Sequence, residues 1–303
     1  FDYRSCLCYL QVNFMNQINL FIELTRLKRP IGYMLLFWPC AWGLTLAYDF
    51  ETNYNLYFFY LTLFFLGSVF MRSAGCIIND IADKEFDQKV SRTKNRPIAS
   101  GKISKLLGFI YASILCFCAL LVLINFNNFT IILAFCSMPL AFTYPLMKRF
   151  TYWPQLFLGI TFNYGLILGW TSIENEISLI PIILYFGAIF WTLGYDTIYG
   201  YQDIADDEII GVKSTSIKFK NNPKNFLFIC YSVTILSYLY LGYLMNFNYF
   251  FYVGAVLMIF HLFFYQLRSF EPNNVNNCLK IFKSNNLFGL IVLIFIYLGK
   301  LSI

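Results

Sequence analysis

The chain has 303 residues, of which 59% are hydrophobic and only 13% are charged. Because soluble domains carry about 25% charged residues, this composition excludes an ordinary soluble domain and indicates lipid as the main solvent. The nine Cys residues include no C-x-x-C pair, and His261 is the single histidine. We therefore expect neither a disulfide framework nor a cysteine–histidine metal centre. We expect the lipid bilayer as a partner, no nucleic acid, and no obligate protein partner.

Uncharged apolar runs predict the transmembrane helices in chain order, since about 20 apolar residues cross a bilayer as a helix. The runs cover residues 30–48, 52–79 (with one charge, Arg72), 106–147, 150–173, 177–195, 225–267 and 284–299. Two of these runs are long enough for two helices and are divided by polar segments at 125–128 and 246–248. The sequence predicts an all-α, multi-pass membrane protein, with about nine transmembrane helices in one bundle around a central cavity.

The chain divides into an N-terminal segment, residues 1–25, and a membrane domain, residues 26–303. Residues 1–14 precede the first methionine, Met15, and we treat them as possibly not native. All but two of the 22 Lys and Arg residues lie in alternate connections, at 26–29, 72–105, 148–149, 213–224 and 268–283. Since cationic loops stay inside, these connections and the N-terminus are expected on the cytoplasmic or matrix side of a bacterial or mitochondrial inner membrane.

A first cluster of acids follows the second predicted helix on this cationic side. Asp80, Asp83 and Asp87 are spaced i, i+3, i+7, so on a helix they would share one face. Stacked carboxylates repel one another, and a bound cation is the usual compensation. Carboxylate oxygens are ligands that Mg²⁺ or Ca²⁺ prefers, so the cluster predicts a metal site.

A second cluster follows the sixth predicted helix, on the same side of the membrane. Asp196, Asp203 and Asp207 are spaced i, i+7, i+11 and would also share a face of one helix. Cations follow both clusters, with Arg92 and Arg96 after the first and Lys213 after the second. Acids that hold Mg²⁺ beside Lys and Arg predict a receptor for a polyanion such as diphosphate.

At these residues the chain resembles the UbiA superfamily of intramembrane prenyltransferases, from about Thr25 onward. The motifs N-D-x-x-D-x-x-x-D and D-x-x-x-D of that superfamily stand here at Asn79–Asp87 and Asp203–Asp207. Within it the chain is most similar to the 4-hydroxybenzoate polyprenyltransferases of ubiquinone synthesis. The segments that carry this likeness are Arg29–Pro39, Arg72–Cys76, Arg92–Gly101, Tyr144–Arg149 with Pro154-Gln155, and Tyr195–Tyr199. Gly200 stands where Ala is expected and Ile98 where Leu is common.

The resemblance implies a Mg²⁺-dependent transfer of a polyprenyl group from polyprenyl diphosphate to the carbon ortho to the hydroxyl of 4-hydroxybenzoate. Mg²⁺ and diphosphate would be held by Asn79, Asp80, Asp83, Asp87, Asp203 and Asp207, with Asp83, Asp196 and Asp207 as the catalytic acids. Arg92, Arg96 and Lys213 would bind the diphosphate. Arg149, Arg29 and Tyr195 would bind the aromatic acceptor, with the Arg149 guanidinium matching its carboxylate as a bidentate fork.

Two alternatives stay open. A prenyltransferase of the same superfamily could take another acceptor: haem, homogentisate or dihydroxynaphthoate. A secondary transporter would place ionisable groups near the bilayer midplane, whereas here the acids lie at the ends of the apolar runs. The isoprenoid tail predicts a channel that opens sideways to lipid, and some of the 35 Phe and 23 Tyr residues could shield an allylic cation.

Overall fold

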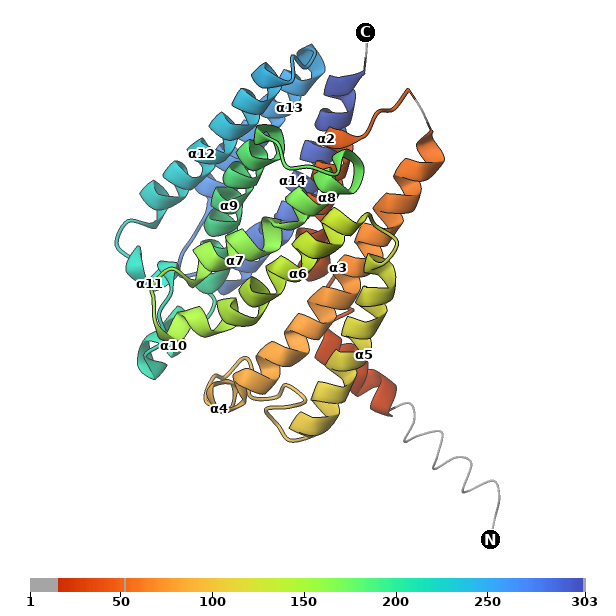
Figure 1. The fold of residues 1–303 in the computed structure, drawn as a ribbon. Coiled ribbons are helices and arrows are strands. Elements are labelled where there is room, and N and C mark those ends of the chain that lie inside the picture. The colour runs from red at the N-terminus through yellow and green to blue at the C-terminus, as the bar shows by residue number, and fades with distance from the viewer. Residues whose placement is uncertain (1–15, 52, 302–303) are drawn as a thin grey trace.

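The computed structural model describes residues 16–51 and 53–301 (Figure 1). Residues 1–14, set aside as possibly not native, lie outside this range. The described chain contains helices and no strand. The helices are α2 (Ile31–Ala47), α3 (Tyr54–Ala82), α4 (Lys84–Asp87), α5 (Lys105–Leu123), α6 (Asn128–Thr143), η1 (Tyr144–Arg149), α7 (Pro154–Asn163), α8 (Gly165–Glu174), α9 (Leu179–Gly200), α10 (Ile204–Ile210), α11 (Thr215–Lys218), α12 (Pro223–Leu244), α13 (Tyr249–Ile259), η2 (Phe260–Leu267) and α14 (Val275–Lys300).

The expected fold class is confirmed. Among the described residues, eight helical stretches are long and apolar enough to cross a membrane. The predicted span that is not among these eight is the first in the chain, α2. It has 17 residues and therefore a length of about 25 Å, near the lower limit for a spanning helix. Both predicted divisions are present, because α5 and α6 are separate helices, as are α12 and α13.

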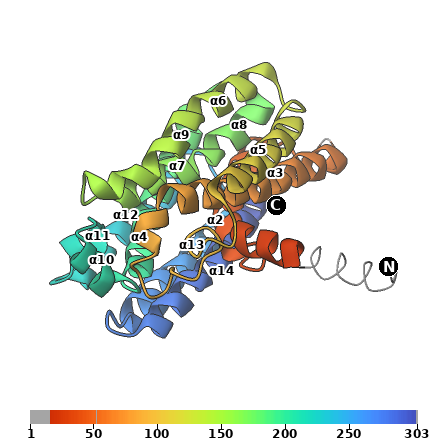
Figure 2. The ribbon, with the colours of Figure 1, turned by 90° about the horizontal axis from the view of Figure 1, so that it is seen from below.

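Helix α2 is the centre of the bundle. It packs against α3, α8, α9 and α14, and it is buried along nearly all of its last three turns. Gly43, Gly165 and Gly169 allow α2 and α8 to touch, since a Cβ at Gly43 would lie 2.0 Å from the Leu166 carbonyl oxygen. Seen from below, α5 and α6 lie on one side of α2, with α13 and α14 on the other (Figure 2).

The short helices gather at one end of the bundle. In Figure 1, α4, α10 and α11 lie together at the lower end, beside the connections that carry both acid clusters. Residues 16–25 form a further helix whose Leu24 is fully buried against Ile77 of α3 and Ala112 of α5. The described part of the N-terminal segment thus packs onto the membrane domain.

At the opposite end, Lys300 of α14 joins the last helix to α2. Its Nζ donates to the carbonyl oxygens of Leu46 and Tyr48, both at 2.6 Å, and to that of Thr45 at 3.3 Å. The last carbonyls of a helix have no partner within the helix, so this lysine satisfies the end of α2 from another span.

A neutral hydrogen-bond network is buried where α9, α12, η2 and α14 meet. Asn285 Oδ1 accepts from Trp191 Nε1 at 2.8 Å and from Gln266 Nε2 at 3.0 Å. Gln266 Oε1 accepts from the Tyr231 hydroxyl at 2.6 Å. The π-helical turn η2 carries Gln266 and His261, and His261 Nδ1 lies 3.3 Å from Gln266 Nε2. We call Trp191, Tyr231, His261, Gln266 and Asn285 the neutral network.

Candidate functional site

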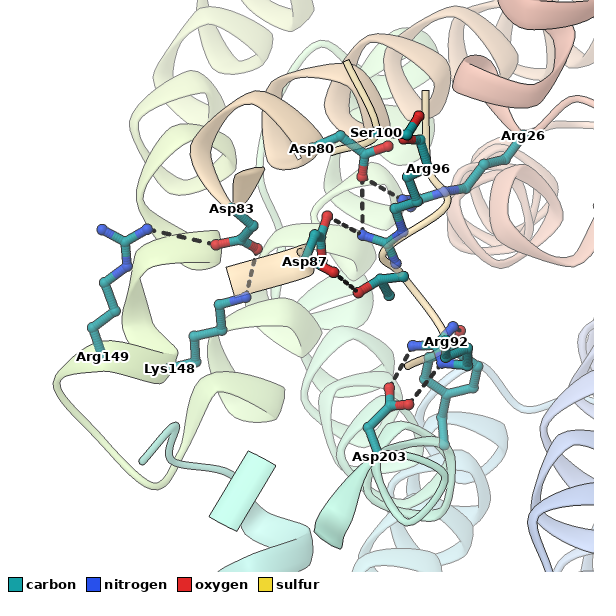
Figure 3. Close-up of polar contacts among 12 residues, drawn as sticks. Arg26, Asp80, Asp83, Asp87, Arg92, Arg96, Ser100, Lys148, Arg149 and Asp203 are labelled. Atoms are coloured by element: carbon teal, nitrogen blue, oxygen red, sulfur yellow. Dashed lines mark hydrogen bonds and ion pairs between the residues drawn. The ribbon is translucent and has the colours of Figure 1, made fainter. Parts of the chain in front are cut away.

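The first acid cluster is buried at the lower end of α3 and is paired with arginines (Figure 3). Asp80 Oδ1 lies 2.5 Å from Arg26 Nη2 and 3.1 Å from Arg96 Nη1, and Asp87 Oδ2 lies 2.8 Å from the same Arg96 nitrogen. Arg26 has a positive φ of 57°, a conformation that non-glycine residues rarely adopt. Such backbone strain persists where the surrounding structure enforces it. Here the strained residue places its guanidinium against Asp80.

Asp83 faces away from those arginines. Its Oδ2 lies 2.5 Å from Lys148 Nζ, and its Oδ1 lies 3.5 Å from Arg149 Nη2. Oδ1 is buried and has no hydrogen-bond donor. The predicted single face of the first cluster therefore holds for Asp80 and Asp87, which share Arg96, while Asp83 is directed to the end of η1. Asn79 lies one turn before Asp83, and its carbonyl accepts the Asp83 N–H at 2.9 Å.

In the second cluster, the expectation of one helix through residues 196–207 is wrong. Helix α9 ends at Gly200, a turn follows, and α10 begins at Ile204. Gly200 explains this geometry, because a Cβ there would lie 2.3 Å from the Ser216 hydroxyl. Because Gly200 has no Cβ, α11 packs directly on the end of α9. Asp196 consequently stays within the bundle, while Asp203 and Asp207 lie at its end.

Arg92 connects the two clusters. It belongs to the connection between α4 and α5 and forms a bidentate ion pair with Asp203, with Nε 2.7 Å from Oδ1 and Nη2 on Oδ2. The connection is anchored by Ile98 and Ile103, which are buried. The connection that follows the first acid cluster thus contacts the second cluster through the Arg92 guanidinium.

Asp207, on α10, lies outside the membrane-spanning helices. Burial, followed by the negative charge of Asp203, raises the pKa of its carboxyl group from 3.8 to about 6, while Lys148 and Arg92 act in the opposite direction. A carboxylate that is half-buried and close to another acid is a group that a bound cation would stabilise.

The acids suit a hard divalent cation, although they are not gathered around one position. Within residues 16–51 and 53–301, no three Asp, Glu, His or Cys side chains come close enough to hold a metal ion. Each of Asp80, Asp83, Asp87 and Asp203 faces a Lys or Arg instead. The donors are oxygen atoms of the kind that Mg²⁺ prefers, and Asp83 Oδ1 accepts no hydrogen bond.

A charged cavity of about 180 Å³ lies beside the acid clusters. Five arginines line it, together with Asp196, Tyr195 and Tyr199; these arginines are Arg26, Arg29, Arg72, Arg92 and Arg96. The Tyr195 hydroxyl is buried without a hydrogen-bond partner. Five guanidinium groups with one carboxylate make this cavity a receptor for a small, highly charged anion.

A second, apolar cavity of about 490 Å³ lies between two helix pairs. α3 packs along α5, and α6 packs along α8, and the cavity separates these pairs. Phe117 of α5 and Phe135 of α6 line it, and both are more than half exposed, so the cavity opens sideways between α5 and α6. Phe126 lies at the end that is farther from the charged cavity and packs on Phe64.

The two cavities share three lining residues: Arg72, Tyr144 and Phe162. We call these residues the junction. The Arg72 guanidinium lies 5.5 Å from the centroid of the Phe162 ring, and the rings of Tyr144 and Phe162 meet edge to face. One molecule with an anionic head and a hydrocarbon tail would therefore extend through the junction from one cavity into the other.

The structure brings together most, but not all, of the site residues expected from sequence. Arg29, Arg92, Arg96, Tyr195 and Asp196 line the charged cavity, and the first acid cluster adjoins it through Arg26 and Arg96. Of the predicted cations, two do not line it. Arg149 donates to the Ala82 carbonyl at 3.2 Å and is over a third exposed. Lys213 donates to the Phe150 carbonyl at 3.3 Å.

Three charged residues of the site were not chosen from sequence: Arg26, Arg72 and Lys148. In the sequence, Arg26 stands among the cations of the inner connections, and Lys148 lies in the segment Tyr144–Arg149 that carries the family likeness. Arg72 carried a usable signal, since it is the one charge within an otherwise apolar run, and a charge at that depth is usually functional.

The family model that describes the UbiA prenyltransferase family matches residues 36–292 of the chain. The chain is 43% identical over 284 residues to the mitochondrial 4-hydroxybenzoate polyprenyltransferase of Drosophila pseudoobscura pseudoobscura, covering 93% of this chain and 70% of that protein. It is 41% identical over 282 residues to the human protein of the same name, covering 93% and 75% respectively.

Solved structures show the same fold. The apo structure of a UbiA homologue from Aeropyrum pernix K1 has a TM-score of 0.73 at 20% identity, covering 89% of this chain and 99% of that one. A UbiA homologue from Archaeoglobus fulgidus, bound to DMAPP and Mg²⁺, has a TM-score of 0.68 at 18% identity, covering 92% and 97%. The match over most of the chain shows that this protein belongs to the UbiA prenyltransferase family.

Proposed function

We propose that this protein transfers a polyprenyl group from polyprenyl diphosphate to the ring carbon ortho to the hydroxyl of 4-hydroxybenzoate, a step of ubiquinone synthesis. The protein would act in the inner mitochondrial membrane, with the acid clusters on the matrix side. The mitochondrial 4-hydroxybenzoate polyprenyltransferases that are about 40% identical to it support both the reaction and the compartment. The cationic connections next to the acid clusters support the orientation.

The observation that carries the proposal is the pair of cavities that meet at the junction. A polyprenyl diphosphate is a compact polyanion on a long hydrocarbon. The charged cavity offers five arginines to the head group, and the apolar cavity offers a sideways opening through which a tail longer than the cavity can pass into lipid. The site suits this substrate class better than a water-soluble one, whose tail would not need the apolar cavity.

Arg26, Arg92 and Arg96 are proposed to bind the diphosphate. Each of them now neutralises an acid, and each would exchange that partner for a phosphate oxygen. The carboxylates released in this way, with Asp83 and Asp207, would hold Mg²⁺, which supplies positive charge against the departing diphosphate. The Archaeoglobus homologue bound to DMAPP and Mg²⁺ supports this choice of metal.

Arg29 and Tyr195 are proposed to bind the aromatic acceptor. The carboxylate of 4-hydroxybenzoate is ionised at neutral pH and needs a cation, and Arg29 lies in the charged cavity beside the unpartnered Tyr195 hydroxyl. Arg149 has the geometry for a bidentate contact, but its guanidinium is turned to Asp83 outside this cavity. The structure therefore favours Arg29 over Arg149 for this role.

Asp196 is proposed to accept the proton that the ring loses. It is the acid that lines the charged cavity, where the acceptor ring would lie next to the junction. Tyr195, adjacent in sequence, would hold the acceptor so that its ortho carbon faces the allylic carbon. Positioning of this kind supplies much of the rate in reactions that join two substrates.

The test is an acceptor assay with mass analysis of the product. Membranes from a host that lacks its own enzyme would contain the full chain and receive a polyprenyl diphosphate, Mg²⁺ and one acceptor at a time. We expect prenylated 4-hydroxybenzoate as the product, and none after EDTA treatment. A product from homogentisate or dihydroxynaphthoate alone, or farnesylated haem, would assign the chain to another acceptor.

A further inference from the structure

The junction between the two cavities fixes where the reaction takes place, if the proposed function holds. The head of a polyprenyl diphosphate belongs in the charged cavity and its tail in the apolar cavity. The C1–O bond joins head and tail, so it must lie where the cavities meet. The shared residues are Arg72, Tyr144 and Phe162, and these side chains therefore surround the bond that breaks.

Phe162 has the position and the orientation to act on this bond. It is the last ring of α7 before the break between α7 and α8, and it is buried. Its face already accommodates a cation, since the Arg72 guanidinium lies 5.5 Å from the ring centroid. Tyr144 meets the ring edge to face and limits its rotation. The half-buried Arg72 and Tyr144 thus contact the Phe162 ring at the junction, Arg72 over its face and Tyr144 edge to face.

We expect the Arg72 guanidinium to move off the face of the Phe162 ring when substrate binds. Its Nε is buried without a hydrogen-bond partner, and no carboxylate of the described chain forms an ion pair with it. A diphosphate in the charged cavity would offer the guanidinium an anionic partner. The movement that brings Arg72 onto a phosphate oxygen uncovers the ring of Phe162.

We infer that Phe162 is a catalytic residue whose ring face stabilises the allylic cation at the junction. The C1–O bond breaks heterolytically, and the electron pair leaves with the diphosphate. The positive charge on the allylic group then lies over the negative face of the ring, where cation–π attraction is strongest in the absence of water. The ortho carbon of the acceptor attacks C1, and its proton passes to Asp196, which restores the aromatic ring.

The experiment compares kcat and substrate affinity across a series at position 162 in the full-length protein. Phe162→Leu keeps the apolar wall and removes the π-face. Fluorinated phenylalanines with one, two and three ring fluorines, introduced at the same codon, keep the shape and weaken the face stepwise. Phe157→Leu is the control, because Phe157 lies on α7 but lines neither cavity. A non-hydrolysable thiolodiphosphate analogue of the substrate measures binding without reaction.

We expect Phe162→Leu to lower kcat at least about 10-fold, or about 1.4 kcal/mol in the barrier, and kcat to fall stepwise with fluorination. Analogue affinity should change less than about twofold throughout, and Phe157→Leu should match wild type. An unchanged kcat with weaker analogue binding would make Phe162 only a wall of the substrate site. Wild-type protein with no prenylated product would instead overturn the proposed function, so the two failures are distinguishable.

Discussion

The neutral network and the acid clusters solve the same problem in different ways. Both bury polar groups in a bundle made of apolar helices. In the neutral network, amide, indole and phenol groups satisfy one another between spans, with Asn285 accepting from Trp191 and Gln266. In the acid clusters, full charges are paired with full charges, as with Asp80 and Arg96. Lipid tails have no groups that compete for the neutral hydrogen bonds. In an ion pair, by contrast, a charged ligand can take the place of the partner that has the same charge.

This difference separates architecture from function within one fold. Substitutions in the neutral network should lower stability and leave the reaction intact. Substitutions in the acid clusters should lower the reaction rate, and they also lower stability where they leave the remaining partner of a buried ion pair without its opposite charge. The predictions below test that division, from the largest expected effect to the smallest.

Asp83→Asn should lower kcat at least about 100-fold, the loss that follows removal of a main electrostatic stabiliser. Its carboxylate is buried, and Oδ1 accepts no hydrogen bond, so this oxygen could contact a bound cation. The measurement is initial rate in membranes with saturating substrates and Mg²⁺. Glu85→Gln is the control, since Glu85 lies exposed on α4 and should change the rate less than about twofold. Wild-type activity in the Asp83 variant would remove the carboxylate from the mechanism.

Asn285→Ala should destabilise the protein by about 1–2 kcal/mol, because the donors of Trp191 and Gln266 lose their acceptor. Thermal unfolding in detergent measures the effect as a lower Tm. The folded fraction should keep its kcat within about twofold. Asn276→Ala, on the exposed face of the same helix, should leave Tm unchanged. A large loss of kcat with an unchanged Tm would place the neutral network in the reaction.

Arg96→Gln should raise the KM for polyprenyl diphosphate about 10-fold, since a charge-assisted contact to phosphate is lost. The KM for 4-hydroxybenzoate should barely move. Lys213→Gln is the informative comparison. Lys213 lies outside the charged cavity, on the Phe150 carbonyl, so we expect less than a twofold change. Equal effects from both variants would return Lys213 to the diphosphate site.

Arg29→Lys should raise the KM for 4-hydroxybenzoate about fivefold, because an ammonium cannot reproduce a bidentate contact. Arg149→Lys should raise it less than twofold, since Arg149 faces Asp83. Steady-state kinetics with the acceptor varied measures both. The reverse order would assign the acceptor carboxylate to Arg149, as its position in the sequence suggested.

The Mg²⁺ concentration needed for half-maximal activity should rise about fourfold between pH 7.5 and pH 5.5. The pKa of Asp207 is raised to about 6 by burial and by Asp203, so the carboxylate is mostly ionised at the higher pH and mostly protonated at the lower one. In the metal-free protein, the same raised pKa means that folding stability falls as the pH rises from about 4 to about 6, and a bound cation relieves that loss. Asp207→Asn should abolish the pH dependence.

The membrane spans were predictable because lipid permits few backbone structures. Every apolar run is helical, although the run 150–173 is divided into α7 and α8. The polar breaks near Asn127 and Asn248 are helix starts capped by those side chains. The acid clusters could be singled out from the sequence as a charged site because acids are rare in this composition. These features depend on local sequence and on the solvent, and both can be known from the sequence alone.

The cavities were not predictable, because they depend on contacts between distant spans. Nothing in the residues around Arg72 shows that Phe162 will lie beside it, 90 positions away in the chain. The end of α9 was misjudged because it depends on the close approach of Ser216 to Gly200. Lys148 and Arg149 are neighbours in sequence, and only the turn of η1 shows that Lys148 makes the shorter contact with Asp83.

The lysine at the end of α14 has a consequence for how the protein is made. α2 emerges from the ribosome first among the spans, yet its final carbonyls find their donor only in Lys300, about 250 residues later. The central helix therefore lacks this partner until α14 has been synthesised. In a chain truncated before α14, the carbonyl end of α2 would lack its lysine donor, so we expect the central helix of such a chain to be less stable at that end.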